Sequence, residues 1–210
     1  MLKPGACNRF ILLAALAPLL QAQGAPDLSL TLSTKDGQKQ FQQGTQIDLE
    51  LRFATTQPGR YQLFSTGIDR RYVRDAELDS FTAEPSLNAR DPLADSGTIM
   101  SGGIGLSRGF GSMPLGTPGL IVPGILNDWI SFRKPGIYRI SAKSTRVITQ
   151  DPKPTPVTLL SNTIEIEILP STVEASRRQL QDAVAVLEAP ATNDEPLRKA
   201  ARTLRYLETA

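Results

Sequence analysis

The chain has 210 residues, no histidine and a single cysteine, Cys7, and its 23 basic and 21 acidic residues give a net charge of +2. Because histidine is absent and the cysteine lies near the N-terminus, Ser-His-Asp and Cys-His nucleophilic systems and most zinc sites are excluded. The positive excess comes from Lys3 and Arg9, so residues 25–210 carry 21 charges of each sign. We therefore expect no basic surface for nucleic acid.

The first 24 residues have the pattern of a secretory signal peptide. Lys3 and Arg9 precede an apolar run over 10–20, which is followed by small residues at Ala22 and Gly24. The run is about 11 residues long, shorter than the roughly 20 that cross a bilayer. We expect cleavage after Ala22 or Gly24, a periplasmic or extracellular location, and no membrane span in the mature chain.

Residues 25–169 consist of short runs in which apolar and polar side chains alternate, separated by Asp-Gly and Pro-Gly turns. This pattern predicts β-strands, and it is clearest at 47–53, where four apolar residues alternate with three charged ones. No helical pattern separates the runs, which favours an antiparallel immunoglobulin-like β-sandwich over a doubly wound α/β fold. Further strands are expected at 28–32, 61–64, 71–73, from 81, and at 126–132, 137–147, 157–160 and 164–168.

Residues 91–127 interrupt this pattern. The segment contains nine glycines and four prolines and has little periodicity. A stretch of this length without regular structure is uncommon in a compact domain, yet its many apolar residues argue against disorder. We predict a long loop rich in glycine and proline that lies over the sandwich.

After Pro170 the apolar spacing changes from two residues to about 3.6, which predicts an αα-hairpin over 170–210. Ser171 and Glu174 fit a capping box for the first helix, and Asp194 can cap the second. The first helix has an apolar stripe formed by Val173, Leu180, Val184 and Leu187. In the second helix we expect Leu197, Leu204 and Leu207, together with Ala201, to face a protein partner or further helical repeats of which this hairpin is the start.

Three carboxylates, Asp91, Asp95 and Asp128, flank the glycine-rich segment. Two carboxylates are the minimum for glycoside hydrolysis, and oxygen ligands suit calcium. Their neighbours Pro92, Ser96 and Asn127 are common in turns and helix caps, so we favour an interpretation in which these side chains stabilise turns. No glycine pattern for phosphate or dinucleotide binding is present. We therefore assign no catalytic residue, metal or cofactor.

Trp129 is the only tryptophan, and it could stack on a sugar or fill the core; we favour the core. The basic residues around the last long strand are expected on the solvent side of the sheet, opposite a buried apolar row. The basic residues are Arg133, Lys134, Arg139 and Arg146, and the buried row is Ile137, Ile140 and Val147.

Three segments, 43–53, 126–140 and 161–168, resemble strands of bacterial immunoglobulin-like domains: an opening G-x-x-I-x-L-x-L-x-F, a central F-x-x-P-G-x-Y-R and a final S-N-x strand. Followed by 200–207, they resemble uncharacterised secreted bacterial proteins in which an immunoglobulin-like sandwich precedes HEAT-like helical repeats. The resemblance implies a sandwich and a helical array and no catalytic residue. A stable array needs about three repeats or more, whereas 170–210 predicts one hairpin.

We therefore expect an exported, non-enzymatic binding or scaffold module of the bacterial cell envelope whose partner is a protein. The alternative is a carbohydrate-binding module or a weak glycosidase. In that alternative the ligand contacts would be Trp129, Asp91, Asp95 and Asp128.

Overall fold

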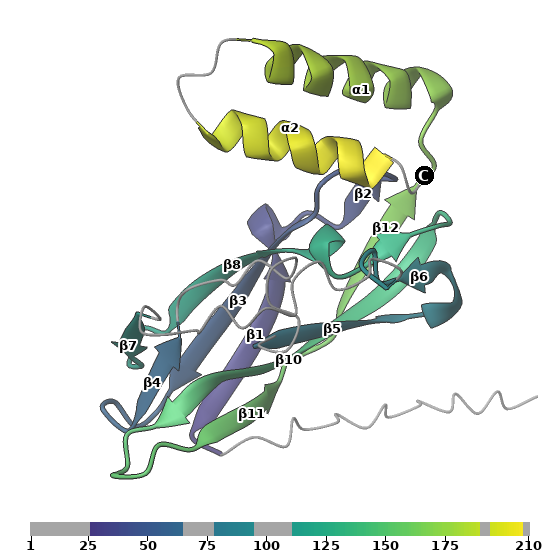
Figure 1. Ribbon diagram of the computed structural model, residues 1–210. Helices are drawn as coiled ribbons and strands as arrows, with labels where there is room; N and C mark the ends of the chain where they lie inside the picture. Colours follow the sequence, from purple (N-terminus) through teal and green to yellow (C-terminus); the bar gives the residue numbers. More distant parts are fainter. Residues whose placement is uncertain (1–25, 65–77, 95–110, 190–193, 208–210) are drawn as a thin grey trace, which may run out of the picture.

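The computed structural model describes residues 26–64, 78–94, 111–189 and 194–207; the expected signal peptide and the expected strand at 71–73 lie outside these ranges. The described chain is mainly β and ends in two helices that form a hairpin (Figure 1). The strands and helices are β1 Leu28–Thr34, β2 Gln40–Gln42, β3 Asp48–Thr55, β4 Tyr61–Phe64, β5 Asp79–Glu84, β6 Ala89–Arg90, β7 Ser112–Pro114, β8 Leu120–Ile125, β9 Ser131–Phe132, β10 Gly136–Thr149, β11 Pro156–Leu160, β12 Ile164–Leu169, α1 Val173–Glu188 and α2 Asp194–Leu207. Short 3-10 turns cover Lys35–Gly37 (η1), Ser86–Asn88 (η3) and Leu126–Asp128 (η4).

The strands form two main sheets that enclose one core. The smaller sheet has the order β1-β3-β8 and the larger β2-β12-β10-β4-β7, with β5 and β11 also paired to β10. Among these pairs only β2 and β12 run parallel, and β6 and β9 form a separate two-stranded ribbon. The predicted mainly-β sandwich with a C-terminal helical hairpin is therefore confirmed.

Alternation along the strands fills the core. In β3 the inward residues Leu49, Leu51 and Phe53 are buried, while the charged residues between them face outward, as the sequence predicts. Tyr61 and Leu63 of β4 and a row of residues from β10 and β12 close the core from the other sheet. Since each buried aliphatic or aromatic side chain contributes about 1.5–3 kcal/mol, this apolar layer is the main source of stability.

A buried tyrosine stabilises the turn that leads into β10. The hydroxyl of Tyr138 donates a hydrogen bond to the carbonyl oxygen of Lys134 at 2.7 Å, and its ring contacts Phe132 with 4.6 Å between centroids. A tyrosine that bonds back to the backbone a few residues upstream is a feature of immunoglobulin-like domains. The same turn leaves Ile137 58% exposed on the outer face of the sheet, so the prediction that Ile137 is buried is wrong.

The long strand β10 changes partners at a bulge between Ser144 and Val147, where it passes from pairing with β5 to pairing with β4. At this bulge Arg146 points inward, and its Nε and Nη2 both bind Oδ2 of Asp79 at 2.7 Å. Its Nη1 donates to the carbonyl oxygen of Phe64 at 3.0 Å. Arg146 therefore joins the end of β4 to the start of β5, and its predicted position on the solvent side is wrong.

The segment 91–127 is a loop only in part. Within its described residues, β7 pairs with β4, and β8 pairs with β3 over six residues of the smaller sheet. The prediction of one loop across 91–127 is corrected accordingly, because Pro123 is accommodated in β8, an edge strand. The expected strand at 126–132 is also shorter: η4 comes first, and only Ser131–Phe132 pair.

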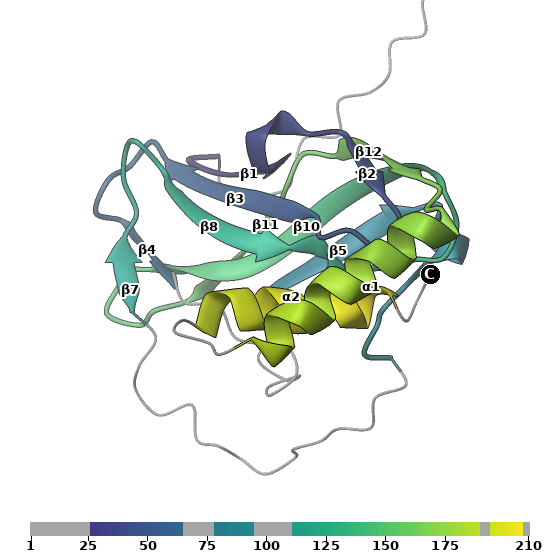
Figure 2. The ribbon, with the colours of Figure 1, turned by 90° about the horizontal axis from the view of Figure 1, so that it is seen from above.

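The hairpin lies at the end of the sandwich where β12 finishes. Figure 1 shows α2 between α1 and the sandwich, and Figure 2 shows α1 running across α2 when seen from above. The N-cap of α1 is Thr172, whose hydroxyl accepts from the amide of Ala175 at 3.1 Å; the predicted cap at Ser171 was thus one residue early.

We predict that Asp79→Ala lowers the free energy of unfolding by about 3–5 kcal/mol, because it leaves the buried Arg146 without its counter-ion. Urea denaturation followed by Trp129 fluorescence measures this. The matched control is Glu165→Ala, which removes the exposed pair with Arg139 at 4.0 Å and is expected to cost less than about 1 kcal/mol. Equal effects of the two substitutions would contradict a structural role for the buried pair.

Candidate functional site

The residues that join the hairpin to the sandwich form the best-defined polar cluster near a surface. We call this site the junction; it comprises Gly44, Asn127, Asp128, Arg205, Tyr206 and Leu207. It is built from the turn before β3, from η4 and from the last turn of α2. These three segments are far apart in sequence, so only the folded sandwich brings them together.

The turn before β3 requires glycine at position 44. Gly44 has a φ of +85°, which side chains other than glycine rarely adopt. A Cβ at this position would also lie 3.2 Å from Cδ2 of Leu207. The turn is closed by Thr45, whose amide and hydroxyl both donate to the carbonyl oxygen of Gln42. Glycine thus allows α2 to approach the backbone of the sandwich closely.

Asn127 connects this turn to η4. Its side-chain oxygen accepts from the amide of Ile47 at 2.7 Å, and its side-chain nitrogen donates to the carbonyl oxygen of Thr45 at 3.0 Å. The amide of Leu126 adds a bond to the carbonyl oxygen of Ile47 at 2.9 Å. These bonds hold η4 in a single position, and with it the next residue, Asp128.

Asp128 binds the helix. The hydroxyl of Tyr206 donates to its Oδ1 at 3.0 Å, and Nη1 of Arg205 lies 3.6 Å from the same oxygen. Tyr206 is 5% exposed, and burial, followed by the negative charge of Asp128 and the hydrogen bond to it, raises the pKa of its phenol. The tyrosine therefore stays protonated and donates across the neutral pH range.

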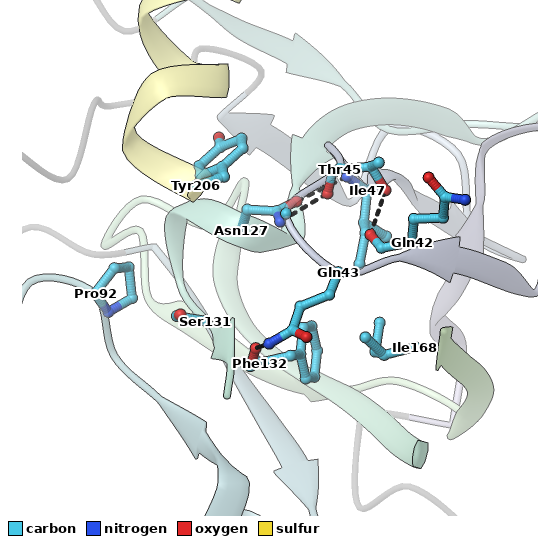
Figure 3. A pocket seen from close by; sticks show the side chains of 11 residues that line it. Gln42, Gln43, Thr45, Ile47, Pro92, Asn127, Ser131, Phe132, Ile168 and Tyr206 are labelled. Carbon is cyan, nitrogen blue, oxygen red and sulfur yellow. Dashed lines mark hydrogen bonds between the residues drawn. The ribbon is translucent and has the colours of Figure 1, made fainter. Parts of the chain in front are cut away.

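Below this contact lies a small cavity, shown in Figure 3, which is lined by residues of the Gln42–Thr45 turn, η4, β9 and α2. The space open to the centre of a water-sized sphere is about 20 Å³, enough for roughly one water molecule. Gln43 spans one wall by donating to the carbonyl oxygen of Phe132 at 3.0 Å. The cavity is too small for a sugar or a cofactor.

A wider hollow of about 650 Å³ lies beside β12, between Gly37–Gln40 and the outer side chains of Glu165 and Glu167. It opens broadly to solvent, and Gln40 donates to Glu167 in its lining at 2.8 Å. Shallow, charged hollows of this kind lack the enclosure that small-molecule sites need.

The two described carboxylates singled out from the sequence, Asp91 and Asp128, have different hydrogen-bond partners. Oδ1 of Asp91 accepts from the amide of Leu93 at 2.9 Å. This bond closes the turn that begins at Asp91, as expected for a side chain that stabilises a turn. Asp128 binds α2, and Asp95 lies outside the described residues. Among the described residues, no group of three or more acidic, cysteine or histidine side chains could hold a metal.

Trp129 packs against the core. Its ring lies 5.0 Å from that of Phe81, at an interplanar angle of 58°, and the side chain is only partly exposed. A tryptophan that stacks on sugars presents an open ring face, whereas the Trp129 ring packs in a tilted geometry against that of Phe81.

The three leucines expected to face a partner are half-buried within this chain. Leu207 lies against Gly44, so the sandwich itself covers the C-terminal end of the row. Leu197 and Leu204 are covered only in part. Sequence reasoning identified Asp128 but missed its partner Tyr206, because position 206 is outside the apolar stripe of α2.

A comparison with protein-family models gave no match, and a search of curated proteins gave no significant match. None of the helices in the described ranges is both long and apolar enough to cross a bilayer.

We predict that Tyr206→Phe lowers the free energy of unfolding by about 1–3 kcal/mol at neutral pH, because a buried bond to a carboxylate is lost. The pKa of Tyr206 is raised above its ordinary 10.0 in the folded protein, so the folded state keeps the proton longer. Its contribution is therefore fully present below pH 10 and declines as the pH rises above 10.

Urea denaturation of both proteins between pH 7 and pH 11 measures the difference. The pKa values of Tyr61 and Tyr138 are raised too, mainly by burial, but these residues are common to both proteins and cancel. Arg198→Ala, which removes an exposed pair with Asp194, is the control and should show no such trend. A difference that does not shrink above pH 10 would contradict the role of the hydroxyl.

Proposed function

We propose that this chain is an exported, non-enzymatic binding or scaffold module of the bacterial cell envelope, in which the sandwich holds the helical hairpin in place as the interacting element. The observation that carries the proposal is an apolar row on α1, formed by Val173, Leu180 and Leu187. These side chains are 71%, 47% and 40% exposed. Ordered apolar rows on a solvated helix commonly mark protein–protein contacts.

The spacing of the row supports a helical partner. Its members are seven residues apart, two helical turns, so they stay close to one line along α1. A neighbouring helix that packs at a shallow angle can contact all three, and the small residue Ala183 is already buried within the hairpin.

Two of the sheet edges are poorly suited to binding. β8 carries Pro123 and β7 ends at Pro114, and each strand lies at one edge of its sheet. Proline cannot donate a backbone hydrogen bond, so a strand added at β7 or β8 would lose ladder bonds. At these two edges, strand addition is therefore disfavoured as the mode of binding.

Export rests on the N-terminal sequence. We predict that the protein recovered from the periplasm or the culture medium begins at Gln23 or Ala25, as intact-mass measurement will show. Leu13→Arg interrupts the apolar run and should leave the full-length chain in the cytoplasm. An unprocessed wild-type chain in the cytoplasm would remove the envelope from the proposal.

Binding through α1 predicts site-specific cross-linking. A photoreactive benzoylphenylalanine in place of Leu180 should give a discrete adduct in intact cells. The same group in place of Arg178 should not, since the two positions are both exposed but point about 200° apart around the helix. If the Leu180 variant is folded and exported but gives no adduct, or if both positions label equally, the hairpin is not the interacting element.

A further inference from the structure

β5 lies at an open edge of the larger sheet. It pairs with β10 on one side, from Asp79 opposite Ser144 to Glu84 opposite Arg139, and with no strand of the described ranges on the other. Edge strands of this kind are usually shielded by proline, by lysine or by being very short. β5 has six residues and contains neither proline nor lysine, so it lacks these protections.

The ladder between β5 and β10 shows which backbone groups are bonded. The amide of Thr145 donates to the carbonyl oxygen of Leu78 at 2.8 Å, one step beyond the end of the paired register. Hydrogen-bonded pairs recur at every second residue of antiparallel strands, so the even-numbered residues of β5 bond to β10. On its other side β10 bonds through even-numbered residues, as the 2.8 Å bond from the amide of Ser161 to the carbonyl oxygen of Ala142 shows. Both observations leave the odd-numbered residues of β5 facing away from β10.

Two residues in the middle of this edge, Phe81 and Ala83, therefore have free backbone groups. Their two amides and two carbonyl groups have no hydrogen-bond partner among the described residues. The two residues are about 6.6–7 Å apart and face the same way, which is the repeat of the bonding groups along a β-strand. A second extended backbone beside β5 matches all four groups at once.

The side chains along the edge indicate the chemistry of such a segment. On the inner face, Ala83 is buried and Phe81 is partly buried against the core. On the outer face, Glu84 is exposed, and its neighbour in register, Arg139, is paired with Glu165 at 4.0 Å. Cross-strand neighbours on one face of a sheet interact, so this edge favours apolar side chains on the inner face and a cation beside Glu84.

We propose that β5 binds an extended segment of a partner protein by strand addition, with apolar side chains on the inner face of the sheet and Lys or Arg on the outer face. The backbone of the segment contributes up to four hydrogen bonds, at Phe81 and Ala83, and its alternate side chains provide specificity. This edge is separate from the apolar row of α1, so strand addition would give the protein a second binding surface beyond the proposed function.

A short peptide tests the contact on the unaltered protein. The probe is Ac-Lys-Val-Lys-Val-Lys-NH2, in which the valine side chains share one face of an extended chain and the lysine side chains share the other. In amide NMR titrations it should shift the signals of Phe81 and Ala83 with a Kd of about 1 mM, as expected for about four hydrogen bonds. It should also slow hydrogen exchange at these two amides.

N-methylation of the peptide distinguishes strand addition from other modes of binding. The valine amides of a strand laid along β5 point toward the edge, because the valine side chains lie on the same face as Phe81 and Ala83. A peptide that is N-methylated at both valines should bind about 10-fold more weakly or worse. The control is the same peptide N-methylated at two lysines, which has the same charge and should keep its affinity.

A substitution blocks the same edge from the side of the protein. The amide of Ala83 makes no bond to β10, so Ala83→Pro should leave the ladder intact but remove a donor from the edge and weaken peptide binding about 10-fold. The control Thr82→Pro removes an amide that bonds to β10 and should lower the unfolding midpoint. If Ala83→Pro does not fold, the two methylated peptides still decide the question.

Fast exchange of the Phe81 and Ala83 amides in the free protein, with binding lost only on methylation of the valines, supports strand addition. It is overturned by amides that are already protected in the free protein, by no binding at millimolar peptide, or by equal affinities of the two methylated peptides. A dimer of the protein alone that Ala83→Pro abolishes would make a second copy the occupant and overturn a separate partner. The cross-linking test at Leu180 is independent of these results, so failure of strand addition leaves the proposed function in place.

Discussion

The fold depends on a single strand that pairs along its whole length. β10 pairs with β12 and β11 on one side and with β5 and β4 on the other, so it is the one strand shared by most of the larger sheet. Its change of partner coincides with a bulge between Ser144 and Val147, and Arg146 is buried there. The burial of a guanidinium is tolerable because Asp79 and the carbonyl oxygen of Phe64 surround it. Oδ1 of Asp79 has no hydrogen-bond partner among the described residues, so this pair is held by one carboxylate oxygen.

The hairpin depends on the sandwich through a similarly small number of contacts. The side chain of Asn127 bonds η4 to the turn before β3. Asp128, the last residue of η4, accepts a hydrogen bond from the hydroxyl of Tyr206. The cavity beneath has room for about one water molecule. The orientation of the two helices is therefore set by these hydrogen bonds rather than by a large apolar interface. Their remaining apolar surface is directed away from the sandwich.

Much of the fold could be predicted from periodicity, because period two in 47–53 and 164–168 indicates strands with one buried face and period 3.6 after Pro170 indicates helices. The apolar stripe of α1, by contrast, is largely exposed. The same rule could have located Arg146: the inward residues Tyr138, Ile140, Ala142 and Ser144 continue to position 146. The prediction for Arg146 failed because its charge was given more weight than its place in the alternation of buried and exposed residues. β8 was missed since glycine and proline dominate its surroundings, and its strand conformation depends on pairing with β3.

The candidate site was harder to predict, for a physical reason. Asp128 was identified, but its meaning depends on Tyr206, 78 residues away, and no local pattern reports a contact of that separation. The carboxylates near the glycine-rich segment were grouped by proximity in sequence. In the structure the two that are described have different partners: Asp91 accepts from the backbone of its own turn, and Asp128 accepts from Tyr206 of α2.

The parallel pairing of β2 with β12 has a mechanical consequence. α1 follows β12 after only three residues, so a pull on the hairpin acts along the axis of β12. The hydrogen bonds of β12 to β2 and to β10 lie across that direction and are strained together, in shear, rather than opened one after another. A force applied to the hairpin would therefore load this sheet without peeling it apart.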